Sequence, residues 1–243
     1  MKVALIGYGK MGKAIEESIF NQNNGNEAIE IVLKISNANI HELTIENLQK
    51  ADVVIEFTTP ATVIKNIKSC IEAGVPIVVG TTGWYDQLHA VKDYCDKYDG
   101  ALLYAANFNI GVNIFFEINK KLAALMSDQQ QYKVRVEEMH HTQKLDSPSG
   151  TAIKIAEQII ENTTNKKSWV NCESDNPYEL EIISHRIENI PGLHEVIYTS
   201  EADEIKIVHT AYSRKGFAEG AMLAAKWLKG KKGFFTMKEV LGF

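Results

Sequence analysis

Short apolar runs alternate with amphipathic segments along the first half of the chain. Apolar strands are predicted at residues 2–6, 29–35, 51–58, 75–79 and 101–105. Helical spacing of apolar residues is found at 13–20, 61–73 and 86–98, and residues 39–49 are predicted as a short helix or a loop. Apolar strands that alternate with helices are typical of a parallel sheet with both faces covered. The predicted fold class is therefore α/β, a Rossmann-type doubly wound sheet with ligand loops at the carboxyl ends of its strands.

The pattern changes after Phe108. Residues 110–126 are predicted as a long helix with an apolar stripe of Ile114, Phe115, Ile118, Leu122 and Leu125. A strand at 132–137 and a second helix beyond residue 150 follow, and then an irregular stretch at 168–177. Strands are expected at 180–187, 193–199 and 204–212, and a helix at 218–229 precedes the closing segment 234–241. Four strands and two helices in this half predict a second, open α+β domain.

Composition excludes several classes of protein. The 243 residues carry a formal net charge of −5, which argues against a nucleic-acid binder that depends on a basic surface. Cys70, Cys95 and Cys172 lie far apart, so we expect reduced thiols in a cytoplasmic protein and no metal site. We expect no secretory signal, and the apolar stretch 101–118 is interrupted by polar residues, so no membrane span is expected.

A glycine-rich turn follows the first strand directly. It comprises Gly7, Tyr8, Gly9, Lys10, Met11 and Gly12, and a helical segment begins next. The spacing G-x-G-x-x-G between a strand and a helix is the dinucleotide fingerprint in its expected context. The glycines allow a tight turn and close approach of the backbone, and the pyrophosphate binds at the start of the helix.

The second strand ends in a cation where an acidic residue is expected. Lys34 stands where an acid would bind the 2′-hydroxyl of NAD ribose. A cation there would accept the 2′-phosphate of NADPH, so NADPH is predicted to be used at least as well as NADH. The alternative is that Lys34 only points to solvent.

The richest group of candidate site residues lies between the strand at 132–137 and the following helix. His140, His141 and Lys144 precede Ser147-Pro148-Ser149-Gly150-Thr151. Either serine can cap the helix and Pro148 suits its first turn, so Gly150 and Thr151 would offer free backbone amides to an anion. The segment predicts a pocket for a carboxylate-bearing substrate with a proton donor in place. The alternative is a capped surface loop.

Residues 138–152 also resemble the signature of the dihydrodipicolinate reductase (4-hydroxy-tetrahydrodipicolinate reductase) family, which is roughly E-x-H-H-x-x-K-x-D-x-P-S-G-T-A. Every fixed position of that pattern is present. The resemblance implies an NAD(P)H-dependent reduction of a cyclic dicarboxylate in the diaminopimelate route to lysine. It implies that His140 and Lys144 serve proton donation and that His141, Gly150 and Thr151 bind substrate.

The resemblance also extends to other segments. Gly80-Thr81-Thr82-Gly83 and Ala105-Ala106-Asn107-Phe108 resemble two cofactor-binding segments of the family. A discontinuous nucleotide domain is implied, residues 1–107 with about 216–243, while residues 108–215 form the substrate and oligomerisation domain of a homotetramer. From the sequence alone, the last helix could join either domain. His194 and His209 are expected to be structural.

Two other functions remain open at this stage. A Rossmann dehydrogenase acting on another small acid would need its own catalytic base, and nothing outside residues 138–151 competes for that role. A redox-sensing protein that binds NAD(P) without turnover would leave the pair of histidines and Lys144 unexplained. An assay of NADPH oxidation separates these functions from a reductase.

Overall fold

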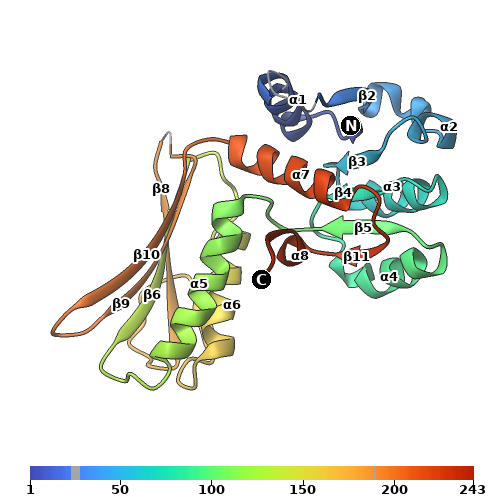
Figure 1. Ribbon diagram of the computed structural model, residues 1–243. Helices are drawn as coiled ribbons and strands as arrows, with labels where there is room; N and C mark the ends of the chain where they lie inside the picture. The colour runs from blue at the N-terminus through green and yellow to red at the C-terminus, as the bar shows by residue number, and fades with distance from the viewer. Residues whose placement is uncertain (23–27, 189) are drawn as a thin grey trace. The chain divides into compact units, whose positions relative to one another are not determined.

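A computed structural model describes residues 1–22, 28–188 and 190–243, which fall into two compact units. The first unit comprises residues 1–110 and 214–243, and the second comprises residues 111–213. The predicted limits at 107 and 216 lie beside these boundaries. The chain thus leaves the first unit once and returns to it for its last thirty or so residues, which include the C-terminal helix (Figure 1).

The described part of the first unit holds a six-stranded parallel sheet in the order β11-β5-β4-β3-β1-β2. Its strands are β1 (Lys2–Ile6), β2 (Glu30–Ile35), β3 (Val53–Glu56), β4 (Ile77–Val79), β5 (Ala101–Tyr104) and β11 (Gly233–Phe235). The edge strand β11 was not predicted, because three half-buried residues next to a helix carry no strand pattern of their own. It forms by pairing with β5.

Helices cover both faces of this sheet, as the alternation of strands and helices predicted. They are α1 (Lys10–Gln22), α2 (Ile45–Leu48), α3 (Pro60–Glu72), α4 (Leu88–Lys97), α7 (Lys215–Leu228) and α8 (Met237–Leu241), with short 3-10 segments η1 (Asn37–Glu42) and η2 (Tyr85–Gln87). Val3 and Leu5 of β1 pack in one core with residues of α1, α7 and α8. Ala4 and Ile6 point to the opposite face and pack with α3 and α4.

The described part of the second unit holds a five-stranded mixed sheet in the order β10-β9-β6-β8-β7. Its elements are α5 (Ile110–Met126), β6 (Lys133–His140), α6 (Gly150–Asn162), β7 (Ser168–Val170), β8 (Glu179–Arg186), β9 (Gly192–Thr199) and β10 (Glu204–Ala211). The central strand β6 is parallel to β8 and antiparallel to β9. Helices α5 and α6 pack against its buried residues Val134 and Val136 in a single core.

Two predictions for this unit were wrong in detail. The stretch expected to be irregular contains β7, so the sheet has five described strands instead of four. The buried side of α5 carries Val112, Phe115, Asn119 and Ala123, while Ile114, Ile118 and Leu125 of the predicted stripe are exposed. The reason is Asn119, whose amide donates to Ile155 O and Gln158 Oε1 of α6, both at 3.1 Å, and so brings a polar residue inside.

In the described chain, every helix is too short or too polar to cross a membrane.

Candidate active site

The turn between β1 and α1 requires glycine at its first and last positions, Gly7 and Gly12, because a side chain there would collide with backbone atoms. Gly7 has a φ of +93°, and a Cβ on it would lie 1.9 Å from Phe57 O. A Cβ on Gly12 would lie 2.8 Å from Gly7 O. The turn therefore packs backbone on backbone and directs the first amides of α1 outward, which is the cradle that a pyrophosphate requires.

A cavity of about 280 Å³ opens beside this turn. It is lined by the predicted Gly9, Lys10, Met11, Gly80, Thr81 and Thr82, and by Phe57, Thr58 and Pro60. None of the last three is among the residues predicted for the site. They follow β3, whose carboxyl end lies between those of β1 and β4 in the sheet, and that position is the signal that could have identified them.

The other predicted cofactor residues lie outside the lining of this cavity. Ala105, Ala106, Asn107 and Phe108 follow β5, the next strand in the sheet after β4. Phe108 is only 2% exposed and its ring packs edge-on against Phe57, with centroids 5.8 Å apart. Its carbonyl oxygen packs against α7: a Cβ added to Gly220 would lie only 1.7 Å from Phe108 O. The Phe108 side chain thus belongs to the core, whereas Ala106 is exposed and Asn107 is half-buried.

Lys34 is held by a neighbour instead of pointing freely to solvent. Its ammonium lies 2.5 Å from Glu16 Oε1 of α1 and over the ring of Tyr8, at 5.1 Å from the centroid. The Tyr8 hydroxyl donates to the same carboxylate. Hydrogen bonds from Lys34 and Tyr8 lower the pKa of Glu16. An anion that approached Lys34 would therefore compete with a carboxylate already in place.

A buried carboxyl group links two loops of the cavity. Glu56, the last residue of β3, accepts hydrogen bonds from Thr58 Oγ1 and from Asn66 Nδ2 at 3.3 Å. Thr58 N in turn donates to Thr81 Oγ1 at 2.7 Å, which ties the loop after β3 to the loop after β4. Burial raises the pKa of Glu56 and outweighs the hydrogen bonds from Thr58, Thr81 and Asn66 that lower it.

In the second unit, the predicted strand-to-helix segment begins inside the strand. His140 was expected on the loop, but it is the last residue of β6 and its side chain is buried, with 8% exposure. Ser149 caps α6, because its hydroxyl accepts from Ala152 N at 3.2 Å. Pro148 precedes the cap, contrary to its predicted place in the first turn. A Cβ added to Gly150 would meet nothing within 4 Å, so the start of α6 is open to a ligand.

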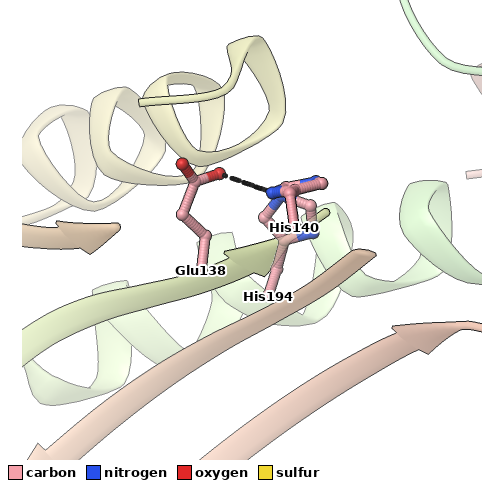
Figure 2. Close-up of side chains that lie close together, drawn as sticks. All are labelled: Glu138, His140 and His194. Atoms are coloured by element: carbon pink, nitrogen blue, oxygen red, sulfur yellow. Dashed lines mark ion pairs between the residues drawn. The ribbon is translucent and has the colours of Figure 1, made fainter. Parts of the chain in front are cut away.

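Glu138 is the buried centre of this segment. Its Oε1 accepts from Ser149 N at 3.0 Å, Ser184 Oγ at 2.8 Å and Arg186 Nη2 at 3.2 Å. Its Oε2 lies 3.3 Å from His140 Nδ1 (Figure 2). Burial alone would raise the pKa of Glu138, but the His140 ring beside it and the hydrogen bonds from Ser149 and Ser184 outweigh burial and hold the pKa well below its usual range. The carboxylate is therefore charged.

His194 joins this group, although only a structural role was expected for it. It pairs with Glu138 across β6 and β9, and its Nε2 lies 3.1 Å from Ser149 Oγ. Burial, followed by the nearby His140, lowers the pKa of His194 to about 3. The imidazole is thus neutral near pH 7. Since Ser149 Oγ already accepts from Ala152 N, its hydroxyl hydrogen is free to donate to His194 Nε2.

Lys144 lies on the exposed loop between β6 and α6. Its ammonium donates to both carboxylate oxygens of Asp146 at 2.8 Å. The loop backbone is held by Arg186, which donates to Asp146 O at 2.5 Å and also reaches Glu138. His141 is half-buried beside it. Of the five residues predicted for this segment, His140 thus contacts the buried Glu138 directly, Lys144 pairs with Asp146, and Gly150 and Thr151 begin α6.

Glu138, His140 and His194 offer donor atoms that all lie within 4.8 Å of one another. Such a set could in principle hold a divalent cation. In the structure the positive charge of Arg186 already neutralises Glu138, and Ser149 occupies Nε2 of His194. These partners occupy Glu138 Oε1 and His194 Nε2, while Glu138 Oε2 and His140 Nδ1 face each other at 3.3 Å.

Comparison with known families covers both units. Residues 1–108 match the family model "Dihydrodipicolinate reductase, N-terminus", and residues 111–241 match "Dihydrodipicolinate reductase, C-terminus". The chain is 48% identical over 242 residues to a 4-hydroxy-tetrahydrodipicolinate reductase of Christiangramia forsetii, covering 99% of this chain and 98% of that one. It is 32% identical over 265 residues to one of Methanosarcina barkeri, covering 100% and 99%.

Solved structures agree with this relationship. A dipicolinate-bound dihydrodipicolinate reductase from Paenisporosarcina sp. TG-14 superposes with a TM-score of 0.79 at 26% identity, covering 98% of each chain. A scyllo-inositol dehydrogenase from Lactobacillus casei superposes with a TM-score of 0.52 at 12% identity, covering 94% of this chain and 86% of that one. The second likeness shows a shared fold only.

Proposed function

The chain belongs to the dihydrodipicolinate reductase family, and from this we propose that it reduces 4-hydroxy-tetrahydrodipicolinate to tetrahydrodipicolinate with NAD(P)H. The reaction is a step of the diaminopimelate route to lysine, in the cytoplasm. The observation that carries the proposal is identity of 48% to a named reductase across 99% of this chain. The complete signature around His140 and Lys144 lies within this matched region and is consistent with the proposal.

The first unit supplies the cofactor site in this proposal. Gly7, Gly9 and Gly12 form the pyrophosphate cradle, and the loops after β3 and β4 line the adjoining cavity. Tyr8, Lys10, Met11, Gly80, Thr81, Thr82 and the segment 105–108 complete the proposed set. The bound cofactor supplies a hydride to carbon 4 of the substrate ring.

We expect NADPH to be used at least as well as NADH. Lys34 is the cation available for a 2′-phosphate, and its present partner Glu16 is 34% exposed. An exposed ion pair contributes only about 0–1 kcal/mol, so a dianionic phosphate can replace it at small cost. Steady-state kinetics with a strong preference for NADH would contradict this part of the proposal.

The second unit supplies substrate binding and the proton. Lys144 holds one carboxylate of the substrate, and the backbone amides of Gly150 and Thr151 hold the other at the start of α6, with His141 beside them. A charge pair about 4 Å apart contributes roughly 4 kcal/mol at an effective dielectric of about 20, against about 1 kcal/mol for a helix terminus. Lys144 therefore dominates binding once it has exchanged Asp146 for the substrate.

The substrate first loses water, which leaves a conjugated C=C–C=N system. Hydride addition at carbon 4 places electron density on the neighbouring carbon, and that carbon takes a proton from the enzyme. His140 suits this role because an imidazole exchanges protons near neutral pH. Lys144 stabilises the negative charge while the proton moves, so one hydride and one proton complete the reduction.

We also propose that the protein is a homotetramer, as the family resemblance implies. Helices α5 and α6 pack on the sheet of the second unit, while its edge strand β10 keeps Ile205 and Val208 exposed. Light scattering of the purified protein measures the oligomer directly.

The assay that tests the function couples dihydrodipicolinate synthase to the purified chain and follows NADPH oxidation. We expect turnover by the wild type and a loss of kcat of at least 10²-fold in Lys144→Ala, with affinity for NADPH unchanged. Lys154→Ala is the matched control, because Lys154 is an exposed lysine of α6 that pairs only with Glu157 among the described residues. Cofactor binding without turnover would favour a redox sensor instead.

A further inference from the structure

Glu138 holds a negative charge in the interior without exposure to water. It projects from β6 and contacts the N-cap of α6, strand β8 and strand β9. Burying a charge is costly unless partners compensate for it. Oε1 has such partners in Ser149 N, Ser184 Oγ and Arg186 Nη2. The carboxylate is therefore fixed in orientation as well as in charge.

The second oxygen of this carboxylate has no such partner. Among the described residues, Glu138 Oε2 and His140 Nδ1 are both buried atoms without a hydrogen bond, and they face each other at 3.3 Å. The two side chains converge in Figure 2. His194 Nε2 is farther away, at 3.7 Å, and already has Ser149 Oγ at 3.1 Å. His140 is thus the group that can satisfy Oε2, and to do so it must carry a proton on Nδ1.

We propose that Glu138 is a positioning residue for the reduction: it binds His140 through Nδ1–H and leaves Nε2 as the nitrogen that exchanges a proton with the substrate. The proposal rests on the proposed function. An apo enzyme often shows a long, poorly aligned hydrogen bond of this kind, which tightens when the substrate binds. A carboxylate behind a histidine fixes the tautomer and the plane of the ring, and stabilises its charged form.

The surroundings of His140 are consistent with this assignment. Its ring packs edge-on against His194, with centroids 5.0 Å apart, and its Nε2 lies beside Gly192 of β9. The charged groups around it are Glu138 on β6 and Arg186 on β8, with Lys144 on the following loop, while the His194 ring of β9 is neutral. Glu138 is the one anion of this group that touches the ring, so its removal should make His140 lose its proton more readily.

The experiment is a comparison of Glu138→Gln, His140→Gln and the double variant in the coupled assay. We expect Glu138→Gln to lower kcat by about 10²-fold, to leave the KM for NADPH unchanged, and to move the alkaline limb of the kcat profile to lower pH. Because Glu138 acts through His140, the double variant should be no slower than His140→Gln alone. Glu138→Asp, which keeps the charge, should recover part of the rate.

Several outcomes would overturn the proposal. If the losses of the two single variants multiply in the double variant, or if Glu138→Gln keeps the wild-type pH profile, Glu138 does not act through His140. Activity lost on dialysis against a chelator and restored by Zn²⁺ would make the cluster a metal site. Absence of turnover in the wild-type protein would contradict the proposed function itself. That outcome is distinguishable from a failure of the proposal for Glu138, which is judged from the variants of an active enzyme.

A measurement on the wild type keeps the test independent of variant folding. Long-range ¹H–¹⁵N spectra of histidine-labelled protein report which ring nitrogen is protonated, and His140→Gln identifies the signal. We expect His140 to carry a proton on Nδ1. A neutral ring with its only proton on Nε2 would contradict the proposal even if Glu138→Gln failed to fold.

Discussion

Two fully buried carboxyl groups of this chain have opposite electrostatic surroundings. Glu56 has donors that are all neutral, Thr58 and Asn66 among them, and its pKa is raised because desolvation dominates. Glu138 has the His140 ring beside it and accepts hydrogen bonds from Ser149 and Ser184, and together these lower its pKa although burial opposes this. Burial alone therefore does not set the charge of a carboxyl group; the groups that contact it decide the direction of its pKa shift.

Gly192 offers a test of how precisely the His140 ring must be placed. A Cβ at residue 192 would lie 3.1 Å from His140 Nε2 and 3.3 Å from Cδ2, so alanine must push the ring by a few tenths of an ångström. We expect Gly192→Ala to lower kcat about tenfold, because misplacement of a catalytic group on this scale reduces rate strongly. The thermal midpoint should fall little. Wild-type kcat in this variant would show that the ring position is not critical.

At the scale of the element, the segment from β6 to α6 positions its candidate site residues because both of its ends belong to regular secondary structure. His140 is fixed by the ladder of β6, and Gly150 by the cap that Ser149 forms on α6. The loop between them is held to β8 by Arg186. The loop that carries Lys144 is thus fixed at both ends and in its middle. These contacts limit its conformational freedom and leave Lys144 partly exposed.

The contact between α5 and α6 contains a polar pair that can be tested for its effect on stability. Asn119→Ala removes the donor to Gln158 Oε1 and leaves a buried acceptor unsatisfied, so we expect the free energy of unfolding to fall by about 2 kcal/mol. Asn119→Leu combined with Gln158→Leu removes both partners and should cost less than Asn119→Ala. Urea unfolding measures both. A larger loss in the double variant would contradict the polar pairing.

At the scale of the whole molecule, the two units differ in how acid affects them. Glu56 of the first unit has a raised pKa in the folded state. Its contribution to the free energy of unfolding is therefore present below about pH 4.5 and is lost as the pH rises through the folded pKa. In the second unit, His194 stays neutral in the fold while the unfolded chain takes up a proton below about pH 6.5. Glu138 adds a further loss below about pH 4.5.

Acidification should therefore destabilise the second unit before ordinary carboxylates titrate. We expect its free energy of unfolding to fall by about 1 kcal/mol per pH unit between about pH 6 and about pH 4, because His194 has a folded pKa of about 3. His194→Asn should flatten this dependence, measured by denaturant unfolding at several pH values. The exposed His89 provides a control variant, His89→Asn. An equally steep slope in His194→Asn would exclude His194 as the cause.

Sequence by itself determined the elements whose signal is local. The parallel strands with their helices, the glycine turn at Gly7–Gly12 and the strand, loop and helix around His140 all follow from residue spacing, because each is set by neighbours within a few positions. The family signature carries the functional assignment for the same reason, since it lies in a single continuous segment.

Only the tertiary structure decided what depends on pairing between distant segments. It places His194 against Glu138 through the register of β6 and β9, adds β11 to the edge of the first sheet, and turns Asn119 inward toward Gln158. It also assigns the C-terminal helix to the first unit. Each of these depends on contacts between residues far apart in the chain, and no local pattern specifies which distant partner a residue meets.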